Sequence, residues 1–383
     1  MSTKASRPAL LVLVVALAWV ARAGSEEARA IADDRFPAAI AKGRAVVQDV
    51  VARGAAPGVG VAVAVGGGVV WSEGFGRADL EHDVPATRLT RFALGSVSKT
   101  LTMAAALRLV DQGRLDLDAP VRSSLADFPH RDPGVTVRRL AAHQSGLADA
   151  FAGRSFLTAT FFPTVDAAYQ EIKKEALESP PGSRTSYATG LYTIIARVME
   201  VAAGRSYAEV MKQEVFGPLG LESVVENDRR RILARRASLY ARSEAGVLEN
   251  APYFDPSHKL AGAGYLSSAE DVARLGAALL RPGFLSDAAR AEMLRTVPLR
   301  DGSPTPFGLG LRKDVIDGRP TWNQPGGGPG MSAWLFLHVE DDLVIALLSN
   351  VPTGPMGGRT HREIAVAFRE AIREGARGGR ASS

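Results

Sequence analysis

The sequence predicts an α+β fold in which one antiparallel sheet is built from both ends of the chain. Near the N-terminus, alternating small and β-branched residues at 58–65 are followed by three glycines and a second apolar run, which is typical of a β-hairpin. Near the C-terminus, apolar runs at 333–339 and 343–349 flank an Asp-Asp turn and predict a second hairpin. Between about 115 and 300 the patterns are mainly helical.

These signals indicate two interleaved regions of one domain rather than separate domains. No internal repeat or clean linker interrupts residues 24–383. We therefore expect a single domain there, with its sheet from about 45–90 and 300–375 and its helical region from about 91–299. The junction of the two regions is the expected place for an active site.

The clearest helical pattern covers residues 96–112. Its stretch from 101 to 110 is apolar nearly all round, which predicts a buried helix, and Gly113 is placed to end it. A helix at 269–280 has Ser267 or Ser268 as a candidate N-cap. Further helices are predicted at 24–45, 189–203 and 362–374.

The first 23 residues have the pattern of a secretory signal peptide. Lys4 and Arg7 give a positive start, residues 9–20 form an apolar run, and Ala21-Arg22-Ala23 fits a cleavage site. The run is short for a membrane span, which takes about 20 residues. We expect a secreted or periplasmic protein with no stable membrane insertion beyond this segment; an uncleaved N-terminal anchor is the alternative.

Composition excludes several kinds of site. The chain has no Cys, which rules out cysteine nucleophiles, zinc–cysteine sites and iron–sulfur clusters. Its six His have no metal-binding spacing, so neither a metal nor a cofactor is expected. The net charge of +5 falls to about +2 without residues 1–23, which carry three basic and no acidic side chains; this is too small to indicate a nucleic-acid partner. The arginine cluster at 229–236 is expected to form a solvated helix face.

The sharpest signal for chemistry is Ser96-Val97-Ser98-Lys99, at the start of the predicted buried helix. Ser96 and Lys99 are three residues apart and share a helix face, and the helix N-terminus places partial positive charge near the serine. A serine needs a base to remove its proton, and burial lowers the pKa of a lysine so that it can be that base. A helix-capping serine beside a surface lysine is the alternative, and Ser98 is the rival nucleophile.

Several segments, in order, resemble the class C β-lactamases and penicillin-binding proteins, most of all their LACTB-like branch. The segment RFALGSVSKTLT at 91–102 resembles the family's nucleophile segment. The other similar segments are GFGRADL at 74–80, LDLDAPV at 115–121, LAAHQSGL at 140–147 and KLAGAGYLSS at 259–268. The resemblance covers about residues 45–370 and implies Ser96 as nucleophile with Lys99 as a proton carrier.

The resemblance also implies partners for Ser96. Tyr187 matches the tyrosine of the family's Tyr-x-Asn motif and would be a second proton carrier, while Thr189 stands in the Asn position and keeps a hydrogen-bonding group. A core tyrosine bonded to the backbone is the alternative for Tyr187. The oxyanion hole would be formed by the backbone N–H groups of Ser96 and Gly327.

The third family motif departs from the pattern. Gln324 stands where relatives carry a basic residue, and Pro325 stands where they carry a hydroxyl residue, while Gly326 keeps the register. Gln324 carries no charge, which weakens carboxylate recognition, and Pro325 fits an edge strand better than a central one. We expect Thr189, Gln324 and Gly326 to contact the substrate.

Together these expectations describe an exported serine hydrolase that cleaves an ester or amide through an acyl-Ser96 intermediate. Its partner would be a small-molecule, peptide or β-lactam-like substrate. The alternative is a catalytically decayed protein that binds a partner or self-assembles, as LACTB-like relatives can. A homo-oligomer is compatible with both the hydrolase and this alternative. His143 is expected to fix a loop near the site, and a Ser-His-Asp triad using it is the weaker alternative.

Overall fold

The computed structural model describes residues 28–149, 158–352 and 355–381. The predicted signal peptide, residues 1–23, lies outside these ranges. None of the helices in these ranges combines the length and the apolar character that crossing a membrane requires.

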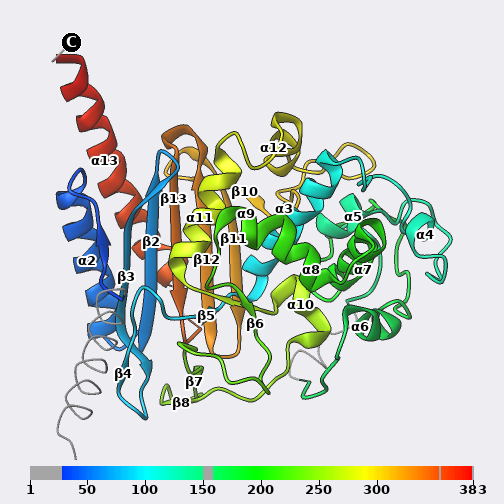
Figure 1. The fold of residues 1–383 in the computed structure, drawn as a ribbon, viewed down its shortest axis with the longest axis horizontal. Helices are drawn as coiled ribbons and strands as arrows, with labels where there is room; N and C mark the ends of the chain where they lie inside the picture. The colour runs from blue at the N-terminus through cyan, green and yellow to red at the C-terminus, as the bar shows by residue number, and fades with distance from the viewer. Residues whose placement is uncertain (1–27, 150–157, 353–354, 382–383) are drawn as a thin grey trace, which may run out of the picture.

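One antiparallel sheet combines the two ends of the chain, which confirms the predicted α+β class (Figure 1). Its strands follow the order β1-β3-β2-β13-β12-β11-β10, with the short β4 paired to β3. The two predicted hairpins meet where β2 pairs with β13, with Val63 opposite Ile345. The strands are β1 (Ile31–Ala32), β2 (Gly58–Val65), β3 (Gly68–Asp79), β4 (Val84–Pro85), β10 (Arg312–Ile316), β11 (Arg319–Gly328), β12 (Met331–His338) and β13 (Leu343–Ser349).

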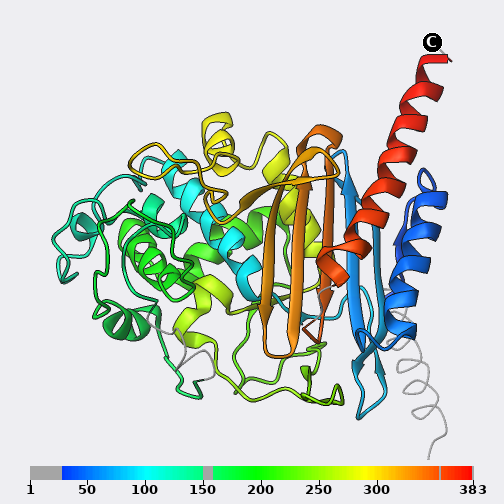
Figure 2. The same ribbon diagram turned by 180° about the vertical axis from the view of Figure 1, so that it is seen from behind.

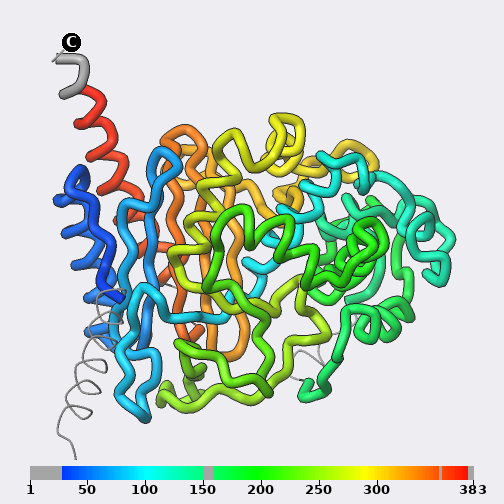
Figure 3. The backbone as a smooth tube through the Cα atoms, viewed as in Figure 1, coloured from blue at the N-terminus to red at the C-terminus, as the bar shows by residue number. Residues whose placement is uncertain are grey.

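Strand alternation gives the sheet two apolar faces. On β13, Val344, Ala346 and Leu348 pack into the core on the side of the helical region, and the residues between them pack into a second core on the other side. Helices α2 (Pro37–Ala52) and α13 (Arg359–Ala381) lie side by side over that second face (Figures 2 and 3). The sheet is therefore covered on both faces.

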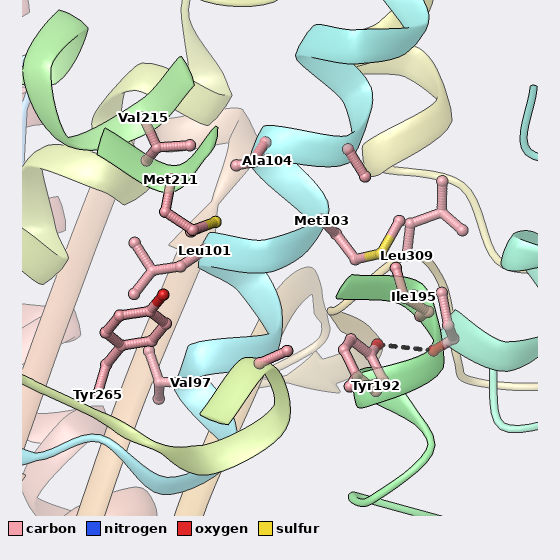
Figure 4. Packing of buried hydrophobic residues seen from close by; sticks show 14 of the residues in the cluster. Val97, Leu101, Met103, Ala104, Tyr192, Ile195, Met211, Val215, Tyr265 and Leu309 are labelled. Atoms are coloured by element: carbon pink, nitrogen blue, oxygen red, sulfur yellow. Dashed lines mark hydrogen bonds between the residues drawn. The ribbon is translucent and has the colours of Figure 1, made fainter. Parts of the chain in front are cut away.

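Helix α3 (Ser98–Asp111) runs through the centre of the helical region. Leu101 and Met103 are 2% and 0% exposed and extend to different sides of the helix, which confirms that it is buried all round (Figure 4). The other helices and turns are η1 (Gly95–Val97), α4 (Val121–Ser124), α5 (Val137–Ala141), α6 (Val165–Ile172), α7 (Tyr192–Ala203), α8 (Tyr207–Met211), η2 (Lys212–Phe216), α9 (Gly217–Leu219), η3 (Ser257–Lys259), α10 (Leu260–Ala263), α11 (Ala269–Leu280), α12 (Asp287–Met293), η4 (Val339–Asp341) and η5 (Pro355–Gly357). The short strands are β5 (Phe92–Ala93), β6 (Val225–Glu226), β7 (Tyr240–Arg242), β8 (Leu248–Asn250) and β9 (Tyr265–Ser267).

Local capping explains where some helices begin. Ser268 caps α11 by accepting the Asp271 N–H, as one of the two predicted caps. The lead-in helix predicted at 24–45 is wrong in its bounds: β1 comes first, and α2 starts at Pro37, whose fixed φ and missing N–H suit a first helical position. The helix predicted for the arginine cluster at 229–236 is also wrong, because those residues lie in turns and loops. Asp228 there bonds the Arg230 N–H at 2.9 Å, a local bond that competes with helix formation.

A buried histidine pair connects α13 to the sheet. The Nε2 atoms of His338 on β12 and His361 on α13 are 2.9 Å apart, and Arg369 donates to His338 Nδ1 at 2.8 Å. Because arginine cannot accept, His338 carries its proton on Nε2 and donates it to His361. The His361 proton is then on Nδ1, which has no hydrogen-bond partner within the described ranges. Burial lowers the pKa of His338 to about 3 and that of His361 to about 2.

Because this pair is buried in its neutral form, we expect the protein to lose stability in mild acid. Both histidines have a lower pKa folded than unfolded, so their stabilising effect is complete above about pH 6.5 and is lost as the pH falls. Between pH 6.5 and 4.5 we expect a loss of about 2–3 kcal/mol per histidine. Urea unfolding should show a clearly smaller loss for the double variant His338→Gln/His361→Leu, and an unchanged loss for the exposed control His82→Gln. Equal pH dependence in all three proteins would contradict the role given to the pair.

Candidate active site

Ser96 lies in the turn η1, between β5 and α3. Gly95 before it has φ +48°, in the left-handed region that glycine adopts most easily. A Cβ at Gly95 would also lie 2.9 Å from the Gly327 nitrogen, so glycine is needed for β11 to approach. The turn therefore places Ser96, which is 9% exposed, at the start of α3 and against β11.

Lys99 lies directly against the Ser96 hydroxyl. Its Nζ is 2.9 Å from Ser96 Oγ, 3.1 Å from Thr189 Oγ1 and 3.1 Å from the Gly262 carbonyl oxygen. Burial lowers the pKa of Lys99, although Tyr187 and Asp149 oppose this shift. A neutral amine has two N–H groups, which Thr189 and Gly262 can accept, and one lone pair. The lone pair is then directed at the Ser96 hydroxyl, the geometry that a proton acceptor requires.

Tyr187 completes this group from the loop before α7. The centre of its ring is 4.8 Å from Lys99 Nζ. Burial of the phenol raises its pKa, but the charge of Lys99 and hydrogen bonds with Ser96, Lys99 and Gln324 outweigh this effect, so the pKa of Tyr187 is lowered. The residue as a whole is 45% exposed. The structure thus brings Ser96, Lys99 and Tyr187 together.

His143 supports Tyr187 from behind. The two ring centres are 4.1 Å apart, and Phe307 packs edge-on against His143 at 5.2 Å. His143 Nδ1 accepts the Ala188 N–H at 3.3 Å, so the neutral ring carries its proton on Nε2. Burial, reinforced by the charge of Lys99, holds the pKa of His143 well below its usual range. No carboxylate within the described ranges hydrogen-bonds this histidine, so the alternative Ser-His-Asp triad gains no support.

The backbone of β11 lies against the Ser96 turn. A Cβ at Gly326 would be 2.0 Å from the Leu94 carbonyl oxygen and 3.1 Å from the Ser96 nitrogen. At Gly327, by contrast, a Cβ would meet nothing within 4 Å. The Ser96 and Gly327 backbones are therefore neighbours, with open space beside Gly327.

Comparison with known proteins identifies the family. The beta-lactamase family model matches residues 44–368. The chain belongs to the beta-lactamase family. It is 28% identical to the mitochondrial serine beta-lactamase-like protein LACTB of Homo sapiens, over 80% of this chain and 73% of LACTB. It is 30% identical to penicillin-binding protein 4* of Bacillus subtilis strain 168, over 76% of this chain and 67% of that protein. Among solved structures, EstCE1, a hydrolase with promiscuous acyltransferase activity, matches with a TM-score of 0.73 at 23% identity, over 88% of this chain and 98% of its own.

The third motif of this beta-lactamase-family chain lies where β11 becomes an edge strand. Strand β10 pairs with β11 only as far as Asn323, so Pro325 lies beyond the last residue of β11 that pairs with β10. A proline without an N–H is tolerated at such an edge. Gln324 Nε2 donates to the Pro325 carbonyl oxygen at 2.9 Å, and the Gln324 side chain also contacts Tyr187. The uncharged amide of Gln324 therefore lies beside Tyr187, at the position where the family resemblance implies a basic residue.

A second buried lysine lies near this beta-lactamase-family site, and sequence reasoning quoted it only as part of a motif. Lys259 is 2% exposed and ends η3, directly before α10, whose Gly262 carbonyl accepts from Lys99. Burial lowers the pKa of Lys259 to about 7; Asp149 opposes the shift and Lys99 reinforces it. The one sequence signal for this residue is a lysine in an otherwise apolar, glycine-rich segment.

Proposed function

We propose that this protein is a serine hydrolase in which Ser96 attacks an ester or amide carbonyl. The observation that carries the proposal is the 2.9 Å contact between Lys99 Nζ and Ser96 Oγ, in a buried setting that favours the neutral amine. Tyr187 is proposed as the second proton carrier, because its phenol contacts both residues and has a lowered pKa.

In the proposed reaction, Ser96 Oγ forms a bond to the carbonyl carbon while its proton passes to the Lys99–Tyr187 pair, which titrates as a coupled unit. The carbonyl oxygen becomes an oxyanion and accepts hydrogen bonds from the Ser96 and Gly327 N–H groups. The bond to the leaving group then breaks as the pair returns the proton to the departing alcohol or amine. Water attacks the acyl-Ser96 in the same way and releases the acid and free serine.

We propose that Thr189, Gln324 and Gly326 position the substrate. Thr189 Oγ1 accepts from Lys99, and Gln324 lies beside Tyr187. None of these residues carries a charge, which favours a neutral group over a carboxylate next to the scissile bond. Small esters and uncharged amides, β-lactam-like ones included, are the proposed class. EstCE1 is described as a hydrolase with promiscuous acyltransferase activity, which supports acyl transfer but names no substrate.

Export is part of the proposal. The signal-peptide pattern of residues 1–23 supports cleavage near residue 23 and an exported catalytic domain at 24–383. N-terminal sequencing of the protein recovered from the periplasm or medium of a bacterial host expressing the full chain should begin near residue 24. Recovery in the cytosol with an intact N-terminus would contradict export.

Hydrolysis of p-nitrophenyl acetate tests the proposed activity. Ser96→Ala should lower kcat/KM to near the uncatalysed background, because it removes the nucleophile. Ser98→Ala is the matched control: its hydroxyl is buried and accepts the Tyr265 N–H at 3.3 Å, so its loss should leave most of the activity. Equal rates for wild type and Ser96→Ala would instead favour a binding protein on a hydrolase fold.

A further inference from the structure

A polar cavity lies beside the turn that joins β11 to β12, next to the hairpin of β7 and β8 (Figure 1). Its volume is about 290 Å³, and its described lining contains none of the residues proposed for catalysis. Leu239 and Ala251 line it and pack against Gly330 in the turn, where a Cβ would lie 2.4 Å from Leu239 Cβ and 2.8 Å from Ala251 Cβ. One wall of the cavity therefore rests on the turn that follows the oxyanion strand.

Two arginines line this cavity, and its described lining includes no acidic residue. Arg229 and Arg236 both belong to the cluster at 229–236 that was expected to form a solvated helix face. Because the cluster lies in turns and loops instead, both side chains reach the same cavity. Burial lowers the pKa of Arg236; the charge of Arg229 reinforces this shift, and Asp228 opposes it. The two guanidinium charges are thus close enough to repel each other.

The guanidinium of Arg229 has all its donors available. It makes no hydrogen bond or ion pair with any described residue, and each of its nitrogens retains accessible surface. Its Cζ lies over the Tyr253 ring, 5.6 Å from the ring centre. Contact with an aromatic ring uses the face of a guanidinium and leaves the N–H groups at its edge for an acceptor.

Arg236 is anchored on one side only. Its Nη2 donates to the backbone carbonyl oxygens of Asp228 at 2.6 Å and Arg231 at 3.3 Å. Both acceptors are uncharged, so they position the guanidinium without neutralising it. Its Nη1 has no acceptor among the described residues and retains accessible surface, so it can donate to a ligand.

Three carboxylates that adjoin the lining residues each have another partner. The pairs are Asp228 with Arg230 at 3.0 Å, Asp79 with the Ser238 hydroxyl at 2.9 Å, and Glu81 with the Asn250 amide at 2.7 Å. None of the three forms an ion pair with Arg229 or Arg236 among the described contacts. The wall of the cavity therefore presents positive charge and free N–H donors.

We propose that this cavity binds a small oxyanion, the phosphate or carboxylate group of a small molecule. Its oxygens would accept hydrogen bonds from Arg229 and from Arg236 Nη1. A guanidinium is planar, and its paired N–H donors match two oxygens of a phosphate or a carboxylate. An anion would also offset the repulsion between the two guanidinium groups, whereas a cation would add to it and a neutral molecule would leave it unchanged.

Isothermal titration of the whole protein with phenyl phosphate tests this site, with phenol as the neutral probe and benzylamine as the cationic one. We expect saturable binding of phenyl phosphate with a stoichiometry of one, weakened by added salt, and much weaker binding of the other two. Arg229→Gln should weaken phenyl phosphate binding about tenfold or more, because it removes a charged donor that has no structural partner.

The matched control is Arg231→Gln. It removes an equal charge from the same cluster, at an exposed position outside the described lining, and should leave binding nearly unchanged. The binding assay does not depend on the proposed hydrolase activity, so the two proposals can fail separately.

The source of the anion is distinguished by hydrolysis of p-nitrophenyl acetate in the presence of phenyl phosphate. Unchanged rates at saturating phenyl phosphate would support a site for a separate molecule. Competitive inhibition that Arg229→Gln relieves would support a site for the anionic end of a substrate.

Four results would overturn the proposal. They are no binding of phenyl phosphate to a folded protein, equal binding of phenol, equal weakening by Arg229→Gln and Arg231→Gln, or binding that Arg229→Gln leaves unchanged.

Discussion

Replacing Lys99 by methionine is expected to slow acylation of Ser96 by about 10²–10⁴-fold. Methionine keeps an unbranched side chain in the buried space but removes the nitrogen that lies 2.9 Å from Ser96 Oγ. The Gly262 carbonyl loses a donor, but the protein no longer buries an amine, so the free energy of unfolding should change by less than about 2 kcal/mol. Stopped-flow acylation by an activated ester, together with urea unfolding, measures both effects.

The control for this variant is Lys173→Met, which removes a lysine outside the site that is paired with Asp127. It should leave the acylation rate nearly unchanged. In wild type, acylation should fall as the pH is lowered, because the Lys99–Tyr187 pair becomes protonated; Lys99→Met should lose part of this dependence. A Lys99→Met protein that acylates at the wild-type rate would remove lysine from the mechanism.

Gly326→Ala is also expected to lower the activity strongly. Its Cβ would overlap the Leu94 carbonyl oxygen at 2.0 Å, so β11 must move away from the Ser96 turn. The Gly327 N–H would move with it, and loss of one oxyanion donor costs about 10²–10³-fold in kcat. We also expect a loss of about 1–3 kcal/mol in the free energy of unfolding, because the contact is overpacked.

The matched control is Gly68→Ala, at the start of β3. A Cβ there would meet only the Val65 carbonyl oxygen, at 4.0 Å, so activity and stability should both stay close to wild type. Crystal structures of the Gly326→Ala variant would show β11 displaced. An active Gly326→Ala enzyme with β11 in place would contradict the assignment of Gly327 to the oxyanion hole.

Local sequence patterns predicted much of the fold. The alternation of small and β-branched residues at 58–65 and the apolar run at 343–349 each predicted a strand, and those residues form the adjacent strands β2 and β13. The stretch at 101–110, which is apolar nearly all round, lies in the buried helix α3. These features depend on residues close together in the chain, so periodicity is enough to find them. The first helix was predicted to start too early. Residues 31–32 form β1 instead, because they pair with β3, about 40 positions away in the chain, and no local pattern indicates such a pairing.

The distance along the chain also explains which residues of the site could be predicted from the sequence. Ser96 and Lys99 share one turn of helix, so their spacing was informative. The stacking of His143 on Tyr187 and the burial of Lys259 arise from packing between segments far apart in sequence. No local pattern encodes such contacts.

The most direct test of the central claim is the intact mass of the purified protein after exposure to a fluorophosphonate, followed by peptide mapping. An activated Ser96 should displace fluoride and form a single phosphonyl adduct on the peptide that contains it. The adduct should be absent in Ser96→Ala and slow to form in Lys99→Met. A folded wild-type protein that forms no adduct, or forms one on Ser98 instead, would contradict the assignment of Ser96 as the nucleophile.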